Sequence, residues 1–384
     1  MFRKISSALF AALCVTALST DACTSWVLHR GATRSGMMIL HKVLDQYPRN
    51  GKLTAGMRVA PNGWRWMCIG NPNYAMNEKG VAMTTNDGDP VAVHHPGKGR
   101  GSLGPASINR IVMTSCSTAE QGVAAILHAG RGKLSAVGGI YFITDPERAF
   151  MININHGYAE VAEIKNGAVV ITNTWHLPGG EEYSTKNFSG GRNDRAREAN
   201  TRMALRESRV DGKYTVRGSL DTSRRTCGKQ LQEMYPFRKM PKVRSLSSVC
   251  FELDREFPAY LSCAYIAQGP QQHTLYLPTP MALRQFPEEF RNGTWSRAAF
   301  DHQEAVGSDH GALPRMRELE DKFIAEFAAV RDRARLLLRE KKTAEAVKLL
   351  NDCYFRQYAE AREFLRGMYA GAGKKAPAPR QNGP

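Results

Sequence analysis

Short apolar segments rich in β-branched and aromatic residues recur between turn-rich stretches in the first half of the chain, a pattern typical of strands. We predict strands at residues 24–29, 37–42, 64–69, 81–85, 139–144, 150–154, 158–164 and 168–172. The first two flank a turn-rich joint and form a plausible hairpin. Short turns such as Asn166-Gly167 join many of the others, so antiparallel pairing should dominate.

A spacing of three to four residues between apolar positions predicts helices elsewhere. Two short ones are expected at residues 106–115 and 118–129, and a charged one at 190–206. Strand character returns at 247–252, 261–267 and 273–277. In residues 314–370, Leu319, Phe323 and Phe327 recur at helical steps, which predicts an antiparallel helix pair. Residues 89–104 read as a loop, and the low-complexity tail from 371 to 384 is expected to be disordered.

Many antiparallel strands together with segregated helices predict an α+β fold of two sheets with helical outer layers. Residues 23–312 would form the main domain, and the helix pair of residues 313–370 would pack on it. The preceding residues resemble a secretory signal peptide, because Arg3 and Lys4 are followed by an apolar stretch and by small residues ending at Ala22. Signal peptidase would then act on the chain, and the product would be secreted or periplasmic.

The composition and the charge distribution limit the kinds of molecule that the protein is expected to bind. No apolar segment is long enough to span a membrane, and the net charge of +17 is spread along the chain with no nucleic-acid motif. We therefore expect neither nucleic-acid binding nor a membrane span, and the basic excess favours anionic envelope surfaces or acidic substrates. The eight cysteines show no zinc-finger spacing, and no metal or organic cofactor is predicted. The sequence is also compatible with a homo-oligomer.

Cleavage after Ala22 would make Cys23 the first residue. Its thiol and its α-amine would then share one residue, and an α-amine with a pKa near 7.7–8.0 can accept the thiol proton without a histidine. Two alternatives remain for this cysteine. It could carry a lipid anchor, or it could belong to a papain-like pair with His156 or His176 as the base.

The segment CTSWVLHRGATRSGMMILHKVLD, residues 23–45, resembles the N-terminal hairpin of the cysteine N-terminal-nucleophile (Ntn) hydrolases. It is most similar to the dipeptidase family, with the penicillin V acylase/bile salt hydrolase and acyl-CoA:isopenicillin N acyltransferase families as relatives. The initial Cys-Thr of that pattern falls on Cys23-Thr24, and its Arg-x-x-Asp falls on Lys42 to Asp45. Lysine in place of the usual arginine is the main departure, because an ammonium cannot form a bidentate fork.

Further segments extend the resemblance. NPNYAMNEKGVAMTTND, residues 71–87, implies an oxyanion role for Asn86, and ITNTWH implies a role near the scissile bond for Asn173. FSGGRNDRAR implies an active-site arginine at Arg192. The late strands and the C-terminal helices are also similar to those of the dipeptidases.

The resemblance implies a four-layer αββα sandwich and an exported hydrolase of linear amides, acting on dipeptides or N-acyl compounds through a thioester on Cys23. It implies that Asp45 orients the amine, that Asn86 and Asn173 hold the oxyanion, and that Arg192 and Lys42 stabilise the thiolate or bind the substrate. An acyltransferase, a degenerate envelope-binding protein and a lipoprotein scaffold remain alternatives.

Overall fold

The computed structural model describes residues 23–46, 53–70, 74–87, 105–130, 139–155, 158–173, 190–225, 244–307 and 311–372. The expected signal peptide, the loop at residues 89–104 and nearly all of the C-terminal tail lie outside these ranges. So do His156 and His176.

The described strands form two sheets in which every neighbouring pair is antiparallel. The six-stranded sheet has the order β10 (Ala168–Ile171), β1 (Thr24–Leu28), β2 (Met38–Gln46), β11 (Arg244–Leu253), β12 (Cys263–Gln268), β13 (Leu277–Pro280). The seven-stranded sheet has the order β3 (Ala55–Val59), β4 (Arg65–Ile69), β5 (Tyr74–Asn77), β6 (Ala82–Asp87), β7 (Gly139–Thr144), β8 (Ala149–Asn155), β9 (Tyr158–Glu163).

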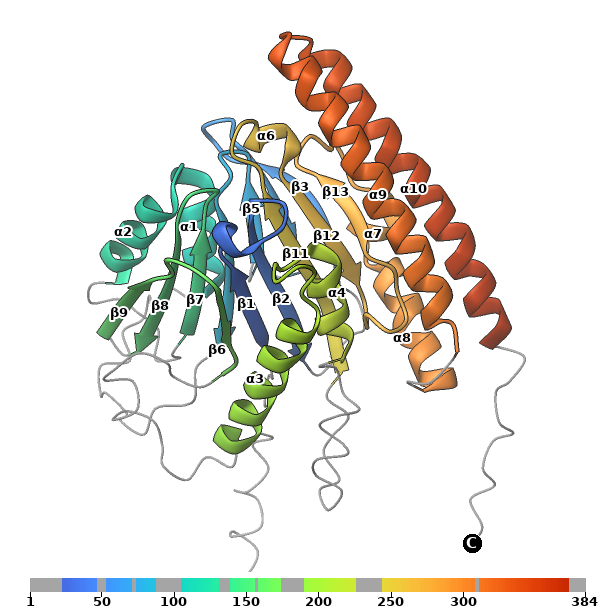
Figure 1. Cartoon of the computed structure of the whole chain (residues 1–384), viewed down its shortest axis with the longest axis horizontal. Helices are drawn as coiled ribbons and strands as arrows, with labels where there is room; N and C mark the ends of the chain where they lie inside the picture. Colours follow the sequence, from blue (N-terminus) through green and yellow to red (C-terminus); the bar gives the residue numbers. More distant parts are fainter. Residues whose placement is uncertain are drawn as a thin grey trace, which may run out of the picture.

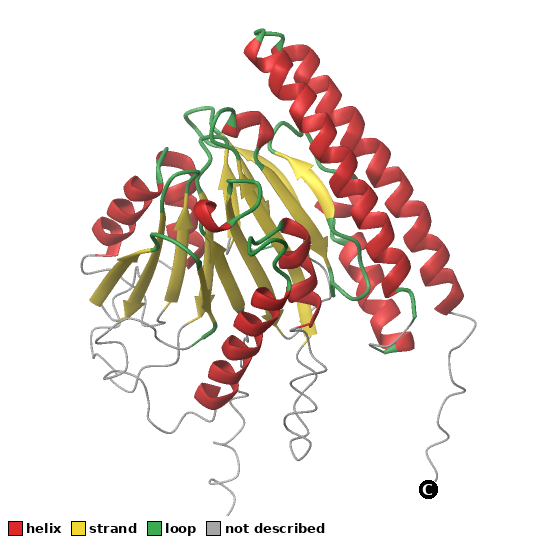
Figure 2. Ribbon diagram, in the orientation of Figure 1, coloured by secondary structure: helices red, strands yellow, loops and turns green. Residues whose placement is uncertain are grey.

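The described helices are α1 (Pro105–Ser115), α2 (Ala119–Gly130), α3 (Gly190–Glu207), α4 (Val216–Arg225), α6 (Pro258–Leu261), α7 (Glu288–Arg291), α8 (Thr294–Val306), α9 (Leu313–Arg339) and α10 (Thr343–Ala372), with a short 3-10 turn, η1 (Arg30–Ala32). Helices α1 and α2 cover the seven-stranded sheet, α4, α9 and α10 pack on the six-stranded sheet, and α6 lies at the ends of the strands (Figures 1 and 2). None of the helices in the described ranges is both long and apolar enough to cross a bilayer.

Three apolar clusters define the layers. One lies between the sheets and joins β1 and β2 to β7, for example Leu40 to Phe142. The second packs the outer face of the six-stranded sheet against α4, α9 and α10, and the third packs β6, β7 and β8 against α1 and α2. Alternate side chains of each strand point to opposite faces, so one strand serves two clusters. The predicted α+β sandwich of two antiparallel sheets between helical layers is confirmed.

Some local predictions were wrong. Residues 273–276 do not form a strand, because the His273 N–H closes a turn on the Pro270 carbonyl at 2.7 Å, and β13 begins only at Leu277. The strand expected from residue 261 begins at Cys263, since Pro258–Leu261 is a helical turn. Strands β3 and β5 and helices α4 and α8 were not predicted. The first residues of the expected disordered tail belong to the end of α10.

Helix α4 fixes the outer face of β1 and β2 through Ser219. The Trp26 Nε1–H donates to Ser219 Oγ at 2.8 Å, and His41 Nδ1 lies 2.8 Å from the same oxygen. His41 Nε2 lies 2.7 Å from Ser248 Oγ on β11. Burial holds the pKa of His41 well below 6.5, so the ring is neutral at physiological pH. These hydrogen bonds fix the outer face of β1 and β2, the strands that carry the candidate site, to α4 and β11.

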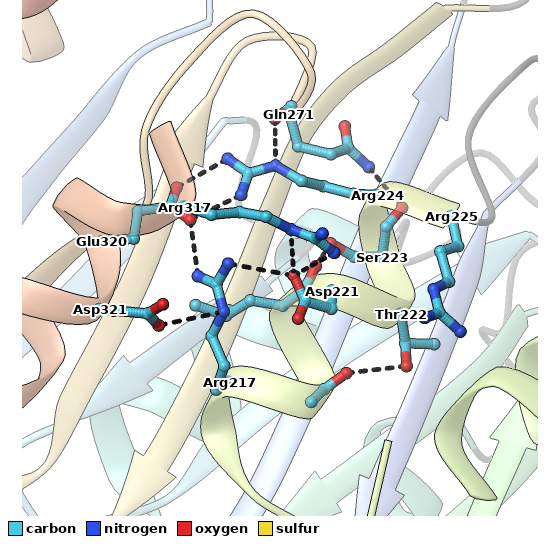
Figure 3. Close-up of polar contacts among 12 residues, drawn as sticks. Arg217, Asp221, Thr222, Ser223, Arg224, Arg225, Gln271, Arg317, Glu320 and Asp321 are labelled. Carbon is cyan, nitrogen blue, oxygen red and sulfur yellow. Dashed lines mark hydrogen bonds and ion pairs between the residues drawn. The ribbon is translucent and has the colours of Figure 1, made fainter. Parts of the chain in front are cut away.

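A buried ion-pair cluster joins α4 to α9 (Figure 3). Glu320 on α9 is fully buried and accepts hydrogen bonds from Arg224 and Arg217 of α4, and from the backbone N–H of Tyr276. Opposite charges and complete hydrogen bonding offset the desolvation of the carboxylate. The predicted C-terminal helix pair is thus attached to the body by charge as well as by apolar contacts.

Candidate active site

Cys23 lies immediately before β1, a strand with β2 on one side and β10 on the other. Its side chain belongs to the cluster between the sheets and is only 3% exposed. The backbone N–H of Cys23 donates to Oδ1 of Asn173 at 2.9 Å. Asn173 lies two residues beyond the end of β10. The antiparallel pairing of β1 with β10 brings Asn173 to Cys23. The pairing therefore places a side-chain acceptor at the nitrogen of Cys23.

Arg197 on α3 links this acceptor to Asp45. Its Nη2–H donates to Oδ1 of Asn173 at 2.9 Å, and its Nη1 lies 3.6 Å from Oδ2 of Asp45. Asp45 stands near the end of β2, and both charged side chains are at least nine-tenths buried. Sequence regions about 150 residues apart thus converge on the nitrogen of Cys23.

Arg197 is the arginine that contacts these residues in the described structure, and the sequence did not single it out, whereas Arg192 stays a prediction. Arg192 lies in the first turn of α3, where the structure describes the backbone and not the side chain. Thr201, Ala204 and Leu205 are the buried positions of this helix, and Arg197 continues their three-to-four-residue spacing. Arg192 stands five residues earlier and does not continue that spacing. Helical phase was the signal in the sequence that could have identified Arg197.

Lys42 and Asn86 form a second polar group between the sheets. The fully buried Lys42 ammonium donates to the Thr85 carbonyl and to Asn86 Oδ1, each at 2.6 Å. Ser25 Oγ–H also donates to Asn86 Oδ1, at 2.7 Å. The described hydrogen bonds of Lys42 thus go to β6, and none that involves the described residues goes to Cys23.

The amide nitrogen of Asn86 donates to the carbonyls of Thr172 at 2.8 Å and Ile171 at 3.4 Å. Asn86 therefore ties β6 to β1, β2 and the end of β10. Both N–H groups of the amide have a carbonyl acceptor in this arrangement, so an oxyanion role would require Asn86 to release Thr172. Thr172 is the neighbour of Asn173, and Asn86 thus fixes the backbone that presents Asn173 to Cys23.

Tyr74 on β5 of the opposite sheet belongs to the same apolar cluster as Cys23. Its hydroxyl forms a short hydrogen bond with Ser247 Oγ on β11. Burial raises the pKa of Tyr74, the bond to Ser247 opposes that shift, and the nearby thiols of Cys68 and Cys23 raise the pKa further. The phenol is therefore neutral at physiological pH, and a proton-bearing group lies in the electrostatic neighbourhood of Cys23.

The histidines of the chain give no metal site among the described residues. His302 pairs with His273, with the two Nδ1 atoms 2.8 Å apart, while His94, His95 and His310 fall outside the described ranges. Within those ranges no group of three or more His, Cys, Asp or Glu residues could hold a metal ion. Cys68, Cys116, Cys250, Cys263 and Cys353 are buried free thiols. Burial raises the pKa of the Cys68 thiol to about 11, which makes it unreactive.

No family model matches the chain, and no curated protein matches it. The chain is similar in structure to a variant of conjugated bile acid hydrolase from Clostridium perfringens, with a TM-score of 0.46, 10% identity and 67% of this chain aligned to 92% of that one. It is also similar to penicillin V acylase from Agrobacterium tumefaciens, with a TM-score of 0.39, 12% identity and coverage of 64% and 83%.

A third similar structure is the N-acylethanolamine-hydrolyzing acid amidase orthologue of Caenorhabditis elegans, with a TM-score of 0.38, 13% identity and coverage of 59% and 92%. All of these TM-scores lie below 0.5, so the resemblance by itself assigns neither a family nor a function to this chain.

Proposed function

We propose that this protein is an N-terminal-nucleophile cysteine hydrolase that cleaves linear amide bonds. The proposal is supported above all by the contact of the Cys23 nitrogen with Asn173, which Arg197 connects to Asp45. A buried backbone N–H is most often satisfied by secondary structure and less often by a side chain. Here the acceptor is the side chain of Asn173, and the buried Arg197 guanidinium links that acceptor to the buried Asp45 carboxylate.

In the 384-residue chain this nitrogen belongs to a peptide bond. We propose that cleavage after Ala22 during export converts it to an α-amine. Asn173 Oδ1 would still accept one of its N–H groups, which leaves the lone pair of the amine to accept the thiol proton. Sulfur attack on the substrate carbonyl then forms a tetrahedral intermediate, the ammonium returns its proton to the leaving nitrogen, and water hydrolyses the thioester.

Asn173 is our candidate for oxyanion stabilisation. Its Oδ1 is an acceptor for Cys23 and Arg197, which orients the Nδ2 donor on the opposite side of the same amide. Removal of one oxyanion donor commonly lowers turnover by about 10²–10³-fold. Asn86, Lys42 and Arg197 become positioning residues in this proposal, because their described hydrogen bonds go to the protein.

The proposed substrate is a dipeptide or an N-acyl compound. The similar structures include enzymes whose names refer to conjugated bile acids, penicillin V and N-acylethanolamines, which belong to one chemical class of amides. No metal or organic cofactor is required by this mechanism, because the amine and the thiol supply the base and the nucleophile.

The test is an assay of the exported protein, with its N-terminus established by intact-mass measurement, against dipeptides, N-acyl amino acids, penicillin V and conjugated bile acids. We expect a mature form that begins at Cys23, and turnover that is lost in Cys23→Ala and Cys23→Ser. Cys116→Ala, which alters another buried free thiol, is the control and should retain activity. Full turnover by Cys23→Ser, or by protein that retains Ala22, would exclude the mechanism. A diacylglyceryl adduct on Cys23 would identify a lipoprotein instead.

A further inference from the structure

Asn153 on β8 is a buried amide whose polar atoms lack hydrogen-bond partners in the described part of the chain. Ala149 and Met151 of this strand belong to the cluster between the sheets, whereas Phe150 and Ile152 belong to the outer cluster. By alternation, Asn153 points between the sheets. It is 3% exposed, and neither its Oδ1 nor its Nδ2 has a hydrogen-bond partner in the described structure.

Glu160 on β9 stands directly opposite Asn153. The two residues are register partners, so their Cβ atoms lie about 4.5–5.5 Å apart. Val161 packs against the outer cluster, and Glu160 therefore points to the same inner face as Asn153. Its Oε2 is buried without a hydrogen-bond partner in the described structure, although the residue as a whole is only half-buried. Two acceptors and one donor group thus lie side by side.

This pair lies at the same end of the sheets as Cys23. The register runs from Asn86 to Ile140, from Ile140 to Asn153 and from Asn153 to Glu160. Adjacent strands are about 4.8 Å apart, so the backbone of Asn153 is roughly 10 Å from that of Asn86. Asn86 in turn donates to Thr172, beside the asparagine that holds the Cys23 nitrogen.

A buried polar atom without a partner costs about 1–3 kcal/mol, and native proteins contain few of them. Three such atoms gathered on two facing side chains indicate that a ligand supplies the missing bonds. We infer that Asn153 and Glu160 form a subsite of the proposed active site that binds a cationic nitrogen of the substrate. This inference rests on the proposed function and narrows its substrate class.

The chemistry of the pair favours a cation. The Glu160 carboxylate and Asn153 Oδ1 accept hydrogen bonds from an ammonium, and Asn153 Nδ2 can donate to a carbonyl of the same substrate. A lysyl residue on the acyl side of the scissile bond fits this pair. Its ammonium can donate to Glu160 and Asn153, and its four-carbon stem spans the distance from the catalytic centre. An anionic acyl group would face Glu160 and be repelled.

The experiment compares two dipeptides that differ only in the terminal ammonium, lysyl-alanine and norleucyl-alanine. The wild-type protein should prefer the lysyl substrate by at least about tenfold in kcat/KM. Asn153→Leu and Glu160→Gln should each reduce that preference by about tenfold, because each lowers kcat/KM for the lysyl substrate far more than for the norleucyl substrate. Thr144→Val is the matched control, because it removes another unpartnered buried oxygen of the same sheet near the opposite end of β7. It should leave the preference intact.

A binding measurement separates this inference from the proposed reaction. In the Cys23→Ala protein, lysyl-alanine should raise the unfolding temperature more than norleucyl-alanine, and Asn153→Leu should abolish the difference. The binding measurement tests the subsite even when the wild-type protein hydrolyses neither dipeptide. Absence of hydrolysis would count against the proposed reaction and not against the subsite. Equal stabilisation by the two dipeptides, or a preference that survives both substitutions, overturns the subsite.

Discussion

Nη2 of Arg197 lies 2.9 Å from Oδ1 of Asn173, the same oxygen that accepts the N–H of Cys23. A single amide oxygen thereby couples helix α3 to the residue that precedes β1. The guanidinium fixes which end of the Asn173 amide is the acceptor, because an arginine can only donate. The orientation of the proposed oxyanion donor therefore depends on an arginine that need not touch the substrate.

Arg197→Lys should reduce kcat by about 10²-fold, because an ammonium lacks the planar fork through which two guanidinium nitrogens contact Asn173 and Asp45, and a small displacement of a catalytic group costs that much. Steady-state kinetics should show a large change in kcat and a small change in KM. The matched control is Arg192→Lys in the same helix, which should stay near wild-type. A large fall in kcat for Arg192→Lys together with near wild-type kcat for Arg197→Lys would identify Arg192 as the active-site arginine.

Asn86→Leu should destabilise the fold by about 2–4 kcal/mol, because it leaves the buried Lys42 ammonium, Ser25 and the Thr172 carbonyl without the amide that they share. Urea unfolding measures the loss. The neighbouring Thr85→Val is the control and should cost only about 1 kcal/mol, since Lys42 binds the backbone of Thr85 and the hydroxyl makes one long hydrogen bond, to Asn109 Oδ1 at 3.4 Å. Unchanged stability with a large fall in kcat would instead assign Asn86 to the oxyanion.

Glu320→Ala should cost about 3–5 kcal/mol, because Arg224 would remain buried with no carboxylate beside it (Figure 3). Asp321→Ala provides the comparison on the same helix. Its side chain is 59% exposed and pairs with Arg217 at 3.2 Å, so its loss should cost less than about 1 kcal/mol. Similar midpoints of chemical unfolding for the two variants would contradict a stabilising role for the buried cluster.

Stability should fall as the pH drops below 6.5, in part because of His41. The native state keeps this ring neutral, whereas the unfolded chain binds a proton near pH 6.5, so the unfolded state is favoured between that value and the lower pKa of the folded protein. The slope is at most about 1.4 kcal/mol per pH unit for one group. His41→Gln should flatten the dependence of the unfolding free energy on pH between about 8 and 5. A slope identical to that of the wild-type protein would show that His41 does not contribute.

The sequence predicted the sheets and the long helices well where the pattern was regular. The helix pair of α9 and α10 is marked by uninterrupted periodicity, whereas the strand predicted at residues 37–42 covers only the first part of β2. Strands β3 and β5 were missed because Ala55–Val59 has mostly half-buried and exposed side chains, and Tyr74–Asn77 is only four residues long. Helix α4 was missed because it consists mainly of polar residues, and it is buried through hydrogen bonds and ion pairs that periodicity does not detect.

The candidate site was predictable in its residue types more than in its contacts. Asp45 and Asn173 were named through the resemblance to the Ntn hydrolases, and the pairing of β1 with β10 brings Cys23 and Asn173 together. Arg197 depends on the rotation of α3 over the sheet edge, which no motif encodes. The orientation of the Asn86 amide likewise depends on contacts with the end of β10, about 86 residues further along the chain.

Strand β1 has a hydrogen-bonded neighbour along both edges, β10 on one side and β2 on the other. Newly exposed chain ends usually fray, and their amides exchange with solvent within seconds. If export removes residues 1–22, the amides of residues 25–28 would stand almost at the chain terminus and yet exchange deuterium as slowly as the core. The proposed nucleophile, Cys23, would then directly precede a strand that is held as firmly as the core.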